Sequence, residues 1–316
     1  MKKLGLIILA IVLFATPALC SEKTYTISVN QIVEHPALDA LRQGFMDSLK
    51  EQGIKAEYNV HIAQGNAATN TQIASQILGE QPDLVLAIST SSAQVVAQKV
   101  KDRPILFTGV TDPVTAGLVK SLENPGANVS GMTDMSPMKK HVELIREILP
   151  SVKSIGVIYN SGEPNSIVLV NLLKKYSSEQ DIGVVEGTIA NSSGVYQAAK
   201  SLVGRADVIY VPTDNTVVSA IESAVKVCNQ NHIPLIAGDV DSVKRGAVAA
   251  LAVDYYLMGR QTGEMGGRVL RDGMKPADMP VESSKQLRLY INKKSSKSMG
   301  VKLPDSVISR ADKIIE

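Results

Sequence analysis

Hydroxyl, amide and carboxylate side chains recur in this chain directly after apolar runs. Five runs rich in Val, Ile and Leu have the continuous apolar character of strands that are buried on both faces of a parallel sheet. In open α/β sheets, ligands bind beyond the carboxyl ends of such strands. The pattern therefore predicts a binding site for a small polar molecule. Its candidate residues are Ser89, Thr90, Ser91 and Ser92 after one run, Asn165 and Ser166 after another, and Asp214, Asn215 and Asp239 after two more.

These groups differ in the charge that they suit. The Ser89–Ser92 loop combines hydroxyls with the free N–H groups of an expected helix start, which favours an anion such as a carboxylate; simple helix capping is the alternative. A ligand ammonium group needs a carboxylate partner once water is excluded. Asp239 and Asp214 are the candidates for this partner. Asp214 could instead serve only as a helix cap, and Asp241 is the next candidate if Asp239 does not bind the ammonium group. His35, followed by Pro36, either lines the site or is a solvated loop residue.

Catalytic motifs are absent from the sequence. It contains no G-x-S-x-G nucleophile elbow, no P-loop and no dinucleotide-binding glycine motif after a strand. The four histidines lie at positions 35, 61, 141 and 232, without the spacing of metal ligands. We therefore expect a binding protein that has no cofactor and no metal site. A periplasmic enzyme on the same kind of α/β sheet, such as a hydrolase or racemase, is the minor alternative.

The first twenty residues have the pattern of a secretory signal peptide. Lys2 and Lys3 precede an apolar stretch from Leu4 to Phe14, which is shorter than the ~20 residues of a membrane-spanning helix, and small residues follow. We expect cleavage at residue 20 and a periplasmic product. A lipid anchor on Cys20 is the less favoured alternative, because Leu19 is not small.

Removal of residues 1–20 from the 316 leaves 296, a length typical of two domains. The 33 basic residues, less the two lysines of the leader, then equal the 31 acidic ones. A chain without net charge is a poor candidate for nucleic-acid binding.

Cys228 remains as a single cysteine, which makes no intramolecular disulfide and is expected to be buried. We expect the protein to be a monomer.

The two halves of the chain resemble each other. Residues 82–113 and 206–242 each contain an acidic residue, an apolar strand, a polar loop, a helix with one apolar face, and a proline before another strand. Alternating strands and helices indicate βαβ units. The fold class is therefore predicted to be α/β, with two similar doubly wound parallel-sheet lobes. The matched positions are Asp83 with Asp207, Thr90 with Thr213, and Pro104 with Pro234.

Periodicity and turn residues also predict the individual elements and the path between the lobes. The first half is expected to have strands at 25–32, 55–62, 84–89 and 105–109 and helices at 37–52, 67–78 and 93–101. The expected later elements include a helix-like run at 216–231, a strand at 247–253, a helix at 255–271 and a strand at 287–291. Chain crossings near 133–136, 253–255 and 282–285 predict a three-strand hinge, which restricts the lobes to opening and closing. The lobes comprise residues 21–134 with 255–284, and 135–254 with 285–316.

Long motifs give the chain a family resemblance. They are EHPALDALRQGF (Glu34–Phe45), PDLVLAIST (Pro82–Thr90), FTGVTDPVTAGLV (Phe107–Val119), GVIYNSGEPNS (Gly156–Ser166), VPTDNTVVSA (Val211–Ala220) and SVKRGAVAALAVDYYLMGRQTGEM (Ser242–Met265). With these motifs the chain resembles the periplasmic substrate-binding proteins of ABC transporters that have the type I, leucine-binding-like fold. It is most similar to the tryptophan- and aromatic-amino-acid-binding branch.

The resemblance implies a function and further site residues. It implies capture of an amino acid between the lobes and delivery to a membrane permease with its ATPase. In leucine-binding-like proteins the loop at Thr108, Val110 and Thr111 faces the ligand carboxylate, and an acidic residue at the place of Asp239 holds the ammonium group. A sugar or nucleoside ligand remains an alternative, although the chain offers no Trp and few Phe to stack on a sugar ring. A membrane receptor in place of the permease is a further alternative.

Overall fold

The computed structural model describes residues 23–284 and 286–316. The predicted signal peptide and Cys20 lie outside this part. The first sheet contains six parallel strands in the order β11-β5-β4-β3-β1-β2. The elements up to its fifth strand are β1 (Tyr25–Gln31), α1 (Pro36–Glu51), β2 (Ala56–Ile62), α2 (Ala67–Glu80), β3 (Leu84–Ile88), α3 (Thr90–Lys99), β4 (Ile105–Val110) and β5 (Val129–Thr133).

The second sheet has seven strands in the order β13-β12-β10-β9-β8-β6-β7, and all pairs are parallel except β10 with β12. Its helices and first five strands are α4 (Met138–Ile148), β6 (Ser154–Asn160), α5 (Pro164–Ser178), β7 (Gly183–Ile189), α6 (Val195–Leu202), β8 (Val208–Val211), α7 (Asn215–Ser219), α8 (Ile221–Asn231), β9 (Leu235–Ala237), α9 (Asp241–Lys244) and β10 (Ala249–Val253). The chain then returns to the first sheet and back again through α10 (Tyr255–Leu270), β11 (Glu282–Ser283), β12 (Leu287–Asn292), α11 (Lys293–Ser298), α12 (Asp305–Ser309) and β13 (Lys313–Ile315).

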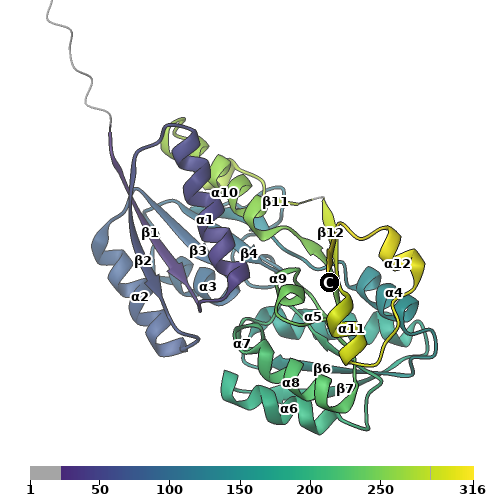
Figure 1. Cartoon of the computed structure of the whole chain (residues 1–316). Coiled ribbons are helices and arrows are strands. Elements are labelled where there is room, and N and C mark those ends of the chain that lie inside the picture. Colours follow the sequence, from purple (N-terminus) through teal and green to yellow (C-terminus); the bar gives the residue numbers. More distant parts are fainter. Residues whose placement is uncertain (1–22, 285) are drawn as a thin grey trace, which may run out of the picture.

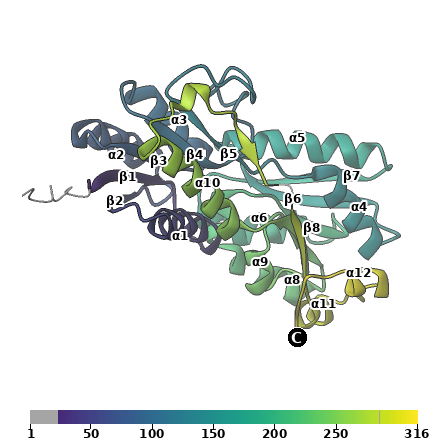
Figure 2. The ribbon, with the colours of Figure 1, turned by 90° about the horizontal axis from the view of Figure 1, so that it is seen from above.

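The predicted fold class is confirmed: two α/β lobes lie side by side, and each has its own hydrophobic core (Figure 1). The five strands β2-β1-β3-β4-β5 and the five strands β7-β6-β8-β9-β10 have the same order. The chain passes between the sheets between β5 and α4, between β10 and α10, and between β11 and β12 (Figure 2). These passages form the predicted three-strand hinge.

The internal repeat has a physical basis at the strand starts. The Asp83 carboxylate accepts a hydrogen bond from the Thr26 N–H (2.9 Å), and the Asp207 carboxylate accepts one from the Ser154 N–H (2.8 Å). Each aspartate therefore ties the start of a lobe's third strand to the start of its first strand.

The structure differs from the sequence prediction between residues 215 and 231. One helix-like run was predicted, but α7 and α8 are separate helices, and Ala220 between them has a non-helical φ of −128°. The first turn of α7 is held by the Asp214 carboxylate, which accepts from the Val217 N–H (2.8 Å), whereas α8 is held by its buried apolar face. Cys228 lies buried on that face, as predicted.

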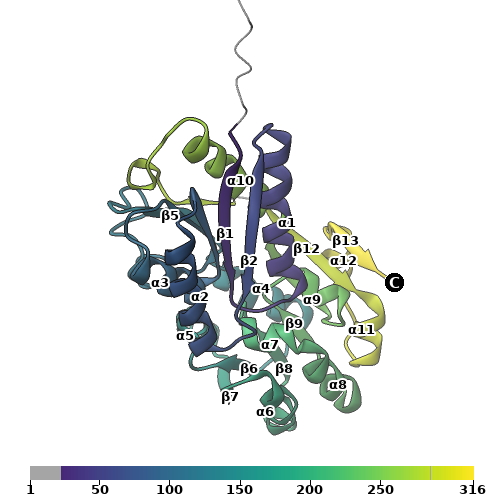
Figure 3. The same cartoon turned by 90° about the vertical axis from the view of Figure 1, so that its left-hand side faces the viewer.

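Two helices of the first lobe pack with their backbones in close contact, although they are far apart in sequence. α1 and α10 lie next to each other in Figure 3. A Cβ atom on Gly259 would lie 2.1 Å from the Leu41 carbonyl oxygen, and one on Gly44 would lie 2.2 Å from the Tyr256 carbonyl oxygen. Only glycine permits this approach. No helix of residues 23–284 and 286–316 is long and apolar enough to cross a membrane.

The α1–α10 contact gives a first prediction. The substitution Gly259→Ala should lower the free energy of unfolding by about 1–3 kcal/mol, because the added methyl group has no space and the backbones must separate. Gly79→Ala is the control, because Gly79 lies in α2 and a Cβ there would meet nothing within 4 Å. It should leave stability unchanged or raise it by up to about 1 kcal/mol. Equal urea midpoints for the two variants would contradict the packing argument.

The buried imidazole of His141 gives a second prediction. Its Nδ1 accepts from the Tyr210 hydroxyl (2.7 Å), its Nε2–H donates to the Leu251 carbonyl (2.7 Å), and burial lowers its pKa to about 4. The unfolded chain binds the proton near pH 6.5 and the folded chain does not. The stabilisation is therefore complete above pH 6.5 and is lost as the pH falls toward 4.

The measurement compares the wild type with His141→Gln, whose amide does not titrate. Between pH 7 and 4 the wild type should lose on the order of 3 kcal/mol more unfolding free energy than the variant. Denaturant unfolding at several pH values measures the difference, and parallel pH profiles would exclude this role for His141.

Candidate functional site: a cleft between the lobes

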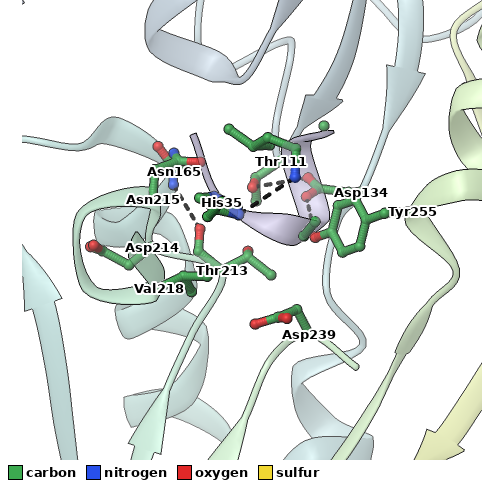
Figure 4. A pocket seen from close by; sticks show the side chains of 13 residues that line it. His35, Thr111, Asp134, Asn165, Thr213, Asp214, Asn215, Val218, Asp239 and Tyr255 are labelled. Carbon is green, nitrogen blue, oxygen red and sulfur yellow. Dashed lines mark hydrogen bonds between the residues drawn. The ribbon is translucent and has the colours of Figure 1, made fainter. Parts of the chain in front are cut away.

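A cavity lies where strand ends of both sheets meet, and it encloses about 350 Å³ including its mouth (Figure 4). Side chains of the first lobe, the hinge and the second lobe all contribute to its wall. The lining residues are His35, Ala37, Leu38, Gly109, Thr111, Asp134, Asn165, Thr213, Asp214, Asn215, Val218, Asp239 and Tyr255.

The predicted site residues divide into three groups. Thr111, Asn165, Asp214, Asn215 and Asp239 line this cavity. Ser91 and Asn215 line an adjoining groove between α2, α3 and the start of α5. The cavity and the groove include none of the remaining predicted residues, which are Ser89, Thr90, Ser92, Thr108, Val110 and Ser166.

Several of this last group have partners inside the protein. The Ser92 hydroxyl is hydrogen-bonded to Asn70, and the Thr108 hydroxyl accepts from the Thr262 hydroxyl (3.0 Å). The Ser166 hydroxyl donates to the Asp214 carboxylate (2.6 Å), and Val110 belongs to the core of the first lobe. These side chains therefore do not face the cavity; they hold the residues that line it in position.

Ser89 and Thr90 are different, because their buried hydroxyls have no hydrogen-bond partner among the described residues. Ser89 has φ 90° and ψ 161°, a conformation that is almost confined to glycine and costs on the order of 1–3 kcal/mol. It does not cap α3 with its side chain. Unpaired buried hydroxyls and a strained backbone at the end of a central strand are features of a ligand-binding position.

His35 lines the cavity, so the solvated-loop interpretation is wrong. The residue is 7% exposed, and burial lowers the pKa of its imidazole to about 4, although a contact with the Asn215 amide acts in the opposite direction. Its Nδ1 accepts from the Leu38 N–H (3.5 Å) and so caps α1. The proton of the neutral ring is therefore on Nε2, an atom that has no partner of hydrogen-bond geometry in the described chain. His35 presents one N–H donor to the cavity.

Asn165 presents an acceptor, and Glu163 fixes its orientation. The Asn165 Nδ2 group donates to the Glu163 carboxylate (3.2 Å) and to the Thr213 carbonyl (3.0 Å), so its Oδ1 is the atom left without a partner. The same carboxylate accepts from the Asn215 Nδ2 (2.7 Å) and from the Thr216 N–H (2.9 Å). Glu163 is the residue before α5, yet its side chain accepts from the first N–H groups of α7 instead of capping its own helix.

Three carboxyl groups line the cavity without a Lys or Arg among the lining residues. Burial raises the pKa of Asp134, Asp214 and Asp239, and repulsion from Glu163 adds to the effect at Asp214. Asp214 already accepts three hydrogen bonds, from Val217, Ser166 and the Asn160 N–H (2.6 Å), which leaves it the least acceptor capacity of the three. Among residues 23–284 and 286–316, Asp239 accepts only from the N–H (2.8 Å) and hydroxyl (2.6 Å) of Ser242, so it keeps free acceptor positions.

Asp241, the substitute for Asp239, does not line the cavity and pairs with Lys244 (2.6 Å). Asp134 and Tyr255 do line it, and the sequence analysis missed both. They lie on two of the chain crossings and are joined by a hydrogen bond from the Tyr255 hydroxyl to the Asp134 carboxylate (2.9 Å). The sequence could have indicated them, because both residues lie in the predicted chain crossings, which border the predicted cleft.

Comparison with known proteins identifies the family. The profile of the family described as ABC transporter substrate binding protein matches residues 26–315, and the chain belongs to that family. Members of this family typically act outside the cytoplasm.

A tyrosine-binding protein from Clostridioides difficile (strain R20291) is 44% identical over 283 residues, which cover 88% of this chain and 82% of the relative. A structure from Streptococcus pneumonia in complex with L-Trp is 33% identical, covers 92% of this chain and 100% of its own, and has a TM-score of 0.87.

A third relative informs on the arrangement of the lobes. The ligand-free, open structure of a substrate-binding protein with adhesive properties from Clostridium difficile is 41% identical, and the match covers 92% of this chain and 99% of that one, with a TM-score of 0.69. It is thus closer in sequence than the L-Trp complex but more distant in structure. The arrangement of the two lobes described here is therefore more like that of the L-Trp complex than that of the open structure, in agreement with one cavity lined from both sides.

The Glu163 network gives a third prediction. Glu163→Gln should lower the free energy of unfolding by about 1–3 kcal/mol, because the amide nitrogen cannot accept from Asn215 or Thr216. Relief of the repulsion with Asp214 offsets only part of this loss. Glu179→Gln, an exposed site at the other end of α5, is the matched control and should have no effect. The interpretation fails if both variants unfold at the same urea concentration.

Proposed function

We propose that this protein captures an aromatic amino acid in the cleft between its lobes and delivers it to an ABC permease. The observation that carries the proposal is the distribution of unpaired groups in the cavity. Donors without partners and carboxyl groups without a cation line one small space. A zwitterion supplies the missing partner to both kinds of group. The relatives described as binding tyrosine and L-Trp support the same ligand class.

The ligand carboxylate is assigned to the donors. His35 Nε2–H and the Thr213 hydroxyl line the cavity without a partner, and the free hydroxyls of Ser89 and Thr90 lie on a neighbouring strand end. A neutral imidazole suits this role because it donates a hydrogen bond without bringing a buried charge of its own. The N-terminus of α3, which lacks a side-chain cap, adds N–H groups that favour an anion.

The ligand ammonium group is assigned to Asp239, with the Asn165 Oδ1 as a second acceptor. Asp239 is buried and has only Ser242 as a partner in the described part of the chain, so an ammonium group would offset the cost of burying its charge. The side chain of the ligand then contacts the apolar part of the wall, formed by Ala37, Leu38 and Val218.

The composition of the cavity wall bears on the ligand class. Tyr255 is the only aromatic side chain among the described lining residues, whereas stacking on a sugar ring calls for aromatic faces. This composition favours the amino acid over the sugar and nucleoside alternatives. We also propose that the protein binds its ligand without chemical conversion.

The cellular setting follows from the same proposal. Residues 1–20 direct the chain to the periplasm as a signal peptide, and the mature protein acts there as a monomer. Ligand contacts made by both lobes shift the population toward the closed arrangement, which the permease and its ATPase then engage.

A ligand screen tests the proposal. Protein that has been unfolded and refolded to remove ligand is tested by thermal shift against the twenty amino acids, sugars and nucleosides. A ligand at a hundredfold excess over its Kd stabilises the folded state by about 2.7 kcal/mol. Tyrosine or tryptophan should raise the midpoint by several degrees. A shift with a sugar or nucleoside alone would overturn the assignment.

The variant Asp239→Asn should abolish the shift while the protein still folds, because Asn keeps an acceptor for Ser242 but loses the charge that holds the ammonium group. Asp272→Asn, at an exposed ion pair with Arg271, is the control and should keep the shift. Calorimetry that gives equal affinities for the two variants would remove Asp239 from the site.

A further inference from the structure

Asp214 spends most of its acceptor capacity inside the protein, and the cavity still offers two further carboxyl groups for the one ammonium group of an amino acid. Asp134 and Asp239 both line it and both keep free acceptor positions, whereas a zwitterionic ligand brings one ammonium group. Figure 4 shows Asp134 grouped with Thr111 and Tyr255, apart from Asp239. The two carboxyl groups therefore face different parts of a bound ligand.

Asp134 occupies a fixed position at the hinge. It directly follows β5, at the first chain crossing, and its partner Tyr255 begins α10 at the second crossing. Its carboxylate accepts from the Tyr255 hydroxyl (2.9 Å) and from the Thr111 hydroxyl (3.2 Å). A carboxylate has about four acceptor positions, so these two bonds leave capacity for a ligand donor.

Independent observations show that this space is built for a ligand. His35 is 7% exposed and Asn165 is 5% exposed, and both line the cavity with a polar atom, Nε2 and Oδ1, that has no partner in the described chain. Buried polar atoms are rarely left unpaired in native proteins. The walls between these polar groups are apolar, with Leu38 and Val218 among them.

We propose that Asp134 accepts a hydrogen bond from a donor on the ring of the ligand, either a phenol O–H or an indole N–H. The protein would then select aromatic amino acids that carry such a donor and discriminate against phenylalanine. This inference rests on the proposed function and adds the ligand subclass and the residue that selects it.

The expected discrimination is moderate. A site that is built to hydrogen-bond a substrate donor rejects the analogue that lacks it, because a buried polar group is then left unpaired. Asp134 keeps Thr111 and Tyr255 as partners in either case, so the penalty is only partial. We expect a preference of about tenfold to a hundredfold for the donor-bearing ligand, the range of a hydrogen bond to a charged group.

Two matched ligand pairs test the proposal by calorimetry on the mature protein. The first pair is tyrosine with phenylalanine. The second is tryptophan with β-(3-benzothienyl)-alanine, in which sulfur replaces the indole N–H at nearly the same shape. Of tyrosine and tryptophan, the one that the wild type binds more tightly should have an affinity about tenfold or more above that of its matched analogue. Equal affinities within both pairs would overturn the proposal, whatever the variants show.

Two variants locate the selecting group. Asp134→Asn should bring the ratio within the preferred pair close to one and leave the affinity for the donor-free analogue within a few fold. Tyr255→Phe disturbs the same hinge network but leaves the carboxylate in place, so it should keep the preference. If the network had a purely structural role, both substitutions would instead change the ligand affinities in the same way, and the affinities for both ligands of a pair would change equally.

The remaining outcomes are also decisive. If Asp239→Asn changes the ratio and Asp134→Asn abolishes all binding, the two carboxyl groups have the opposite roles and the proposal is wrong. If none of the aromatic amino acids binds the wild type, the proposed function itself fails and this inference fails with it. Binding of all four ligands with equal strength would leave the proposed function intact and exclude only the role of Asp134.

Discussion

The main electrostatic constraint on the cleft between the lobes is the burial of carboxyl groups without basic partners. Asp134 and Asp239 lie in the closed cavity, where the lining residues include no Lys or Arg. Burial raises their pKa values, which is the sign that the charged form is disfavoured there. Such a cavity is costly when empty and closed. The cost of these buried charges falls if a positively charged group enters the cavity or if the carboxyl groups are protonated.

The fold could be predicted because it rests on local patterns that occur twice. Asp83 and Asp207 tether equivalent strands, and Val85 and Ile209 donate from their backbones to Pro104 and Pro234 at equivalent points. Apolar runs, prolines and polar loop starts recur in the same order, so the strand order of one lobe follows from that of the other. The division of one helix-like run at Ala220, the short elements α9 and β11, and the last elements near the C-terminus escaped this reasoning.

The site could be predicted only at the level of loops. Thr108 and Ser166 are in the predicted loops, but their hydroxyls pair with Thr262 and Asp214, which are 154 and 48 positions away in sequence. Asp134 and Tyr255 meet across 121 positions. Which atom of a loop faces the ligand depends on such distant partners, and no local pattern encodes them.

The close contact of α1 with α10 has a consequence for biosynthesis. The Tyr256 hydroxyl donates to Asp47 across 209 positions, and the glycine faces of the two helices pack only when both are present. A nascent chain therefore exposes the apolar face of its first helix until more than four-fifths of the protein has been made. Contacts of such long range slow folding. The first lobe therefore completes its fold only after most of the protein has been synthesised.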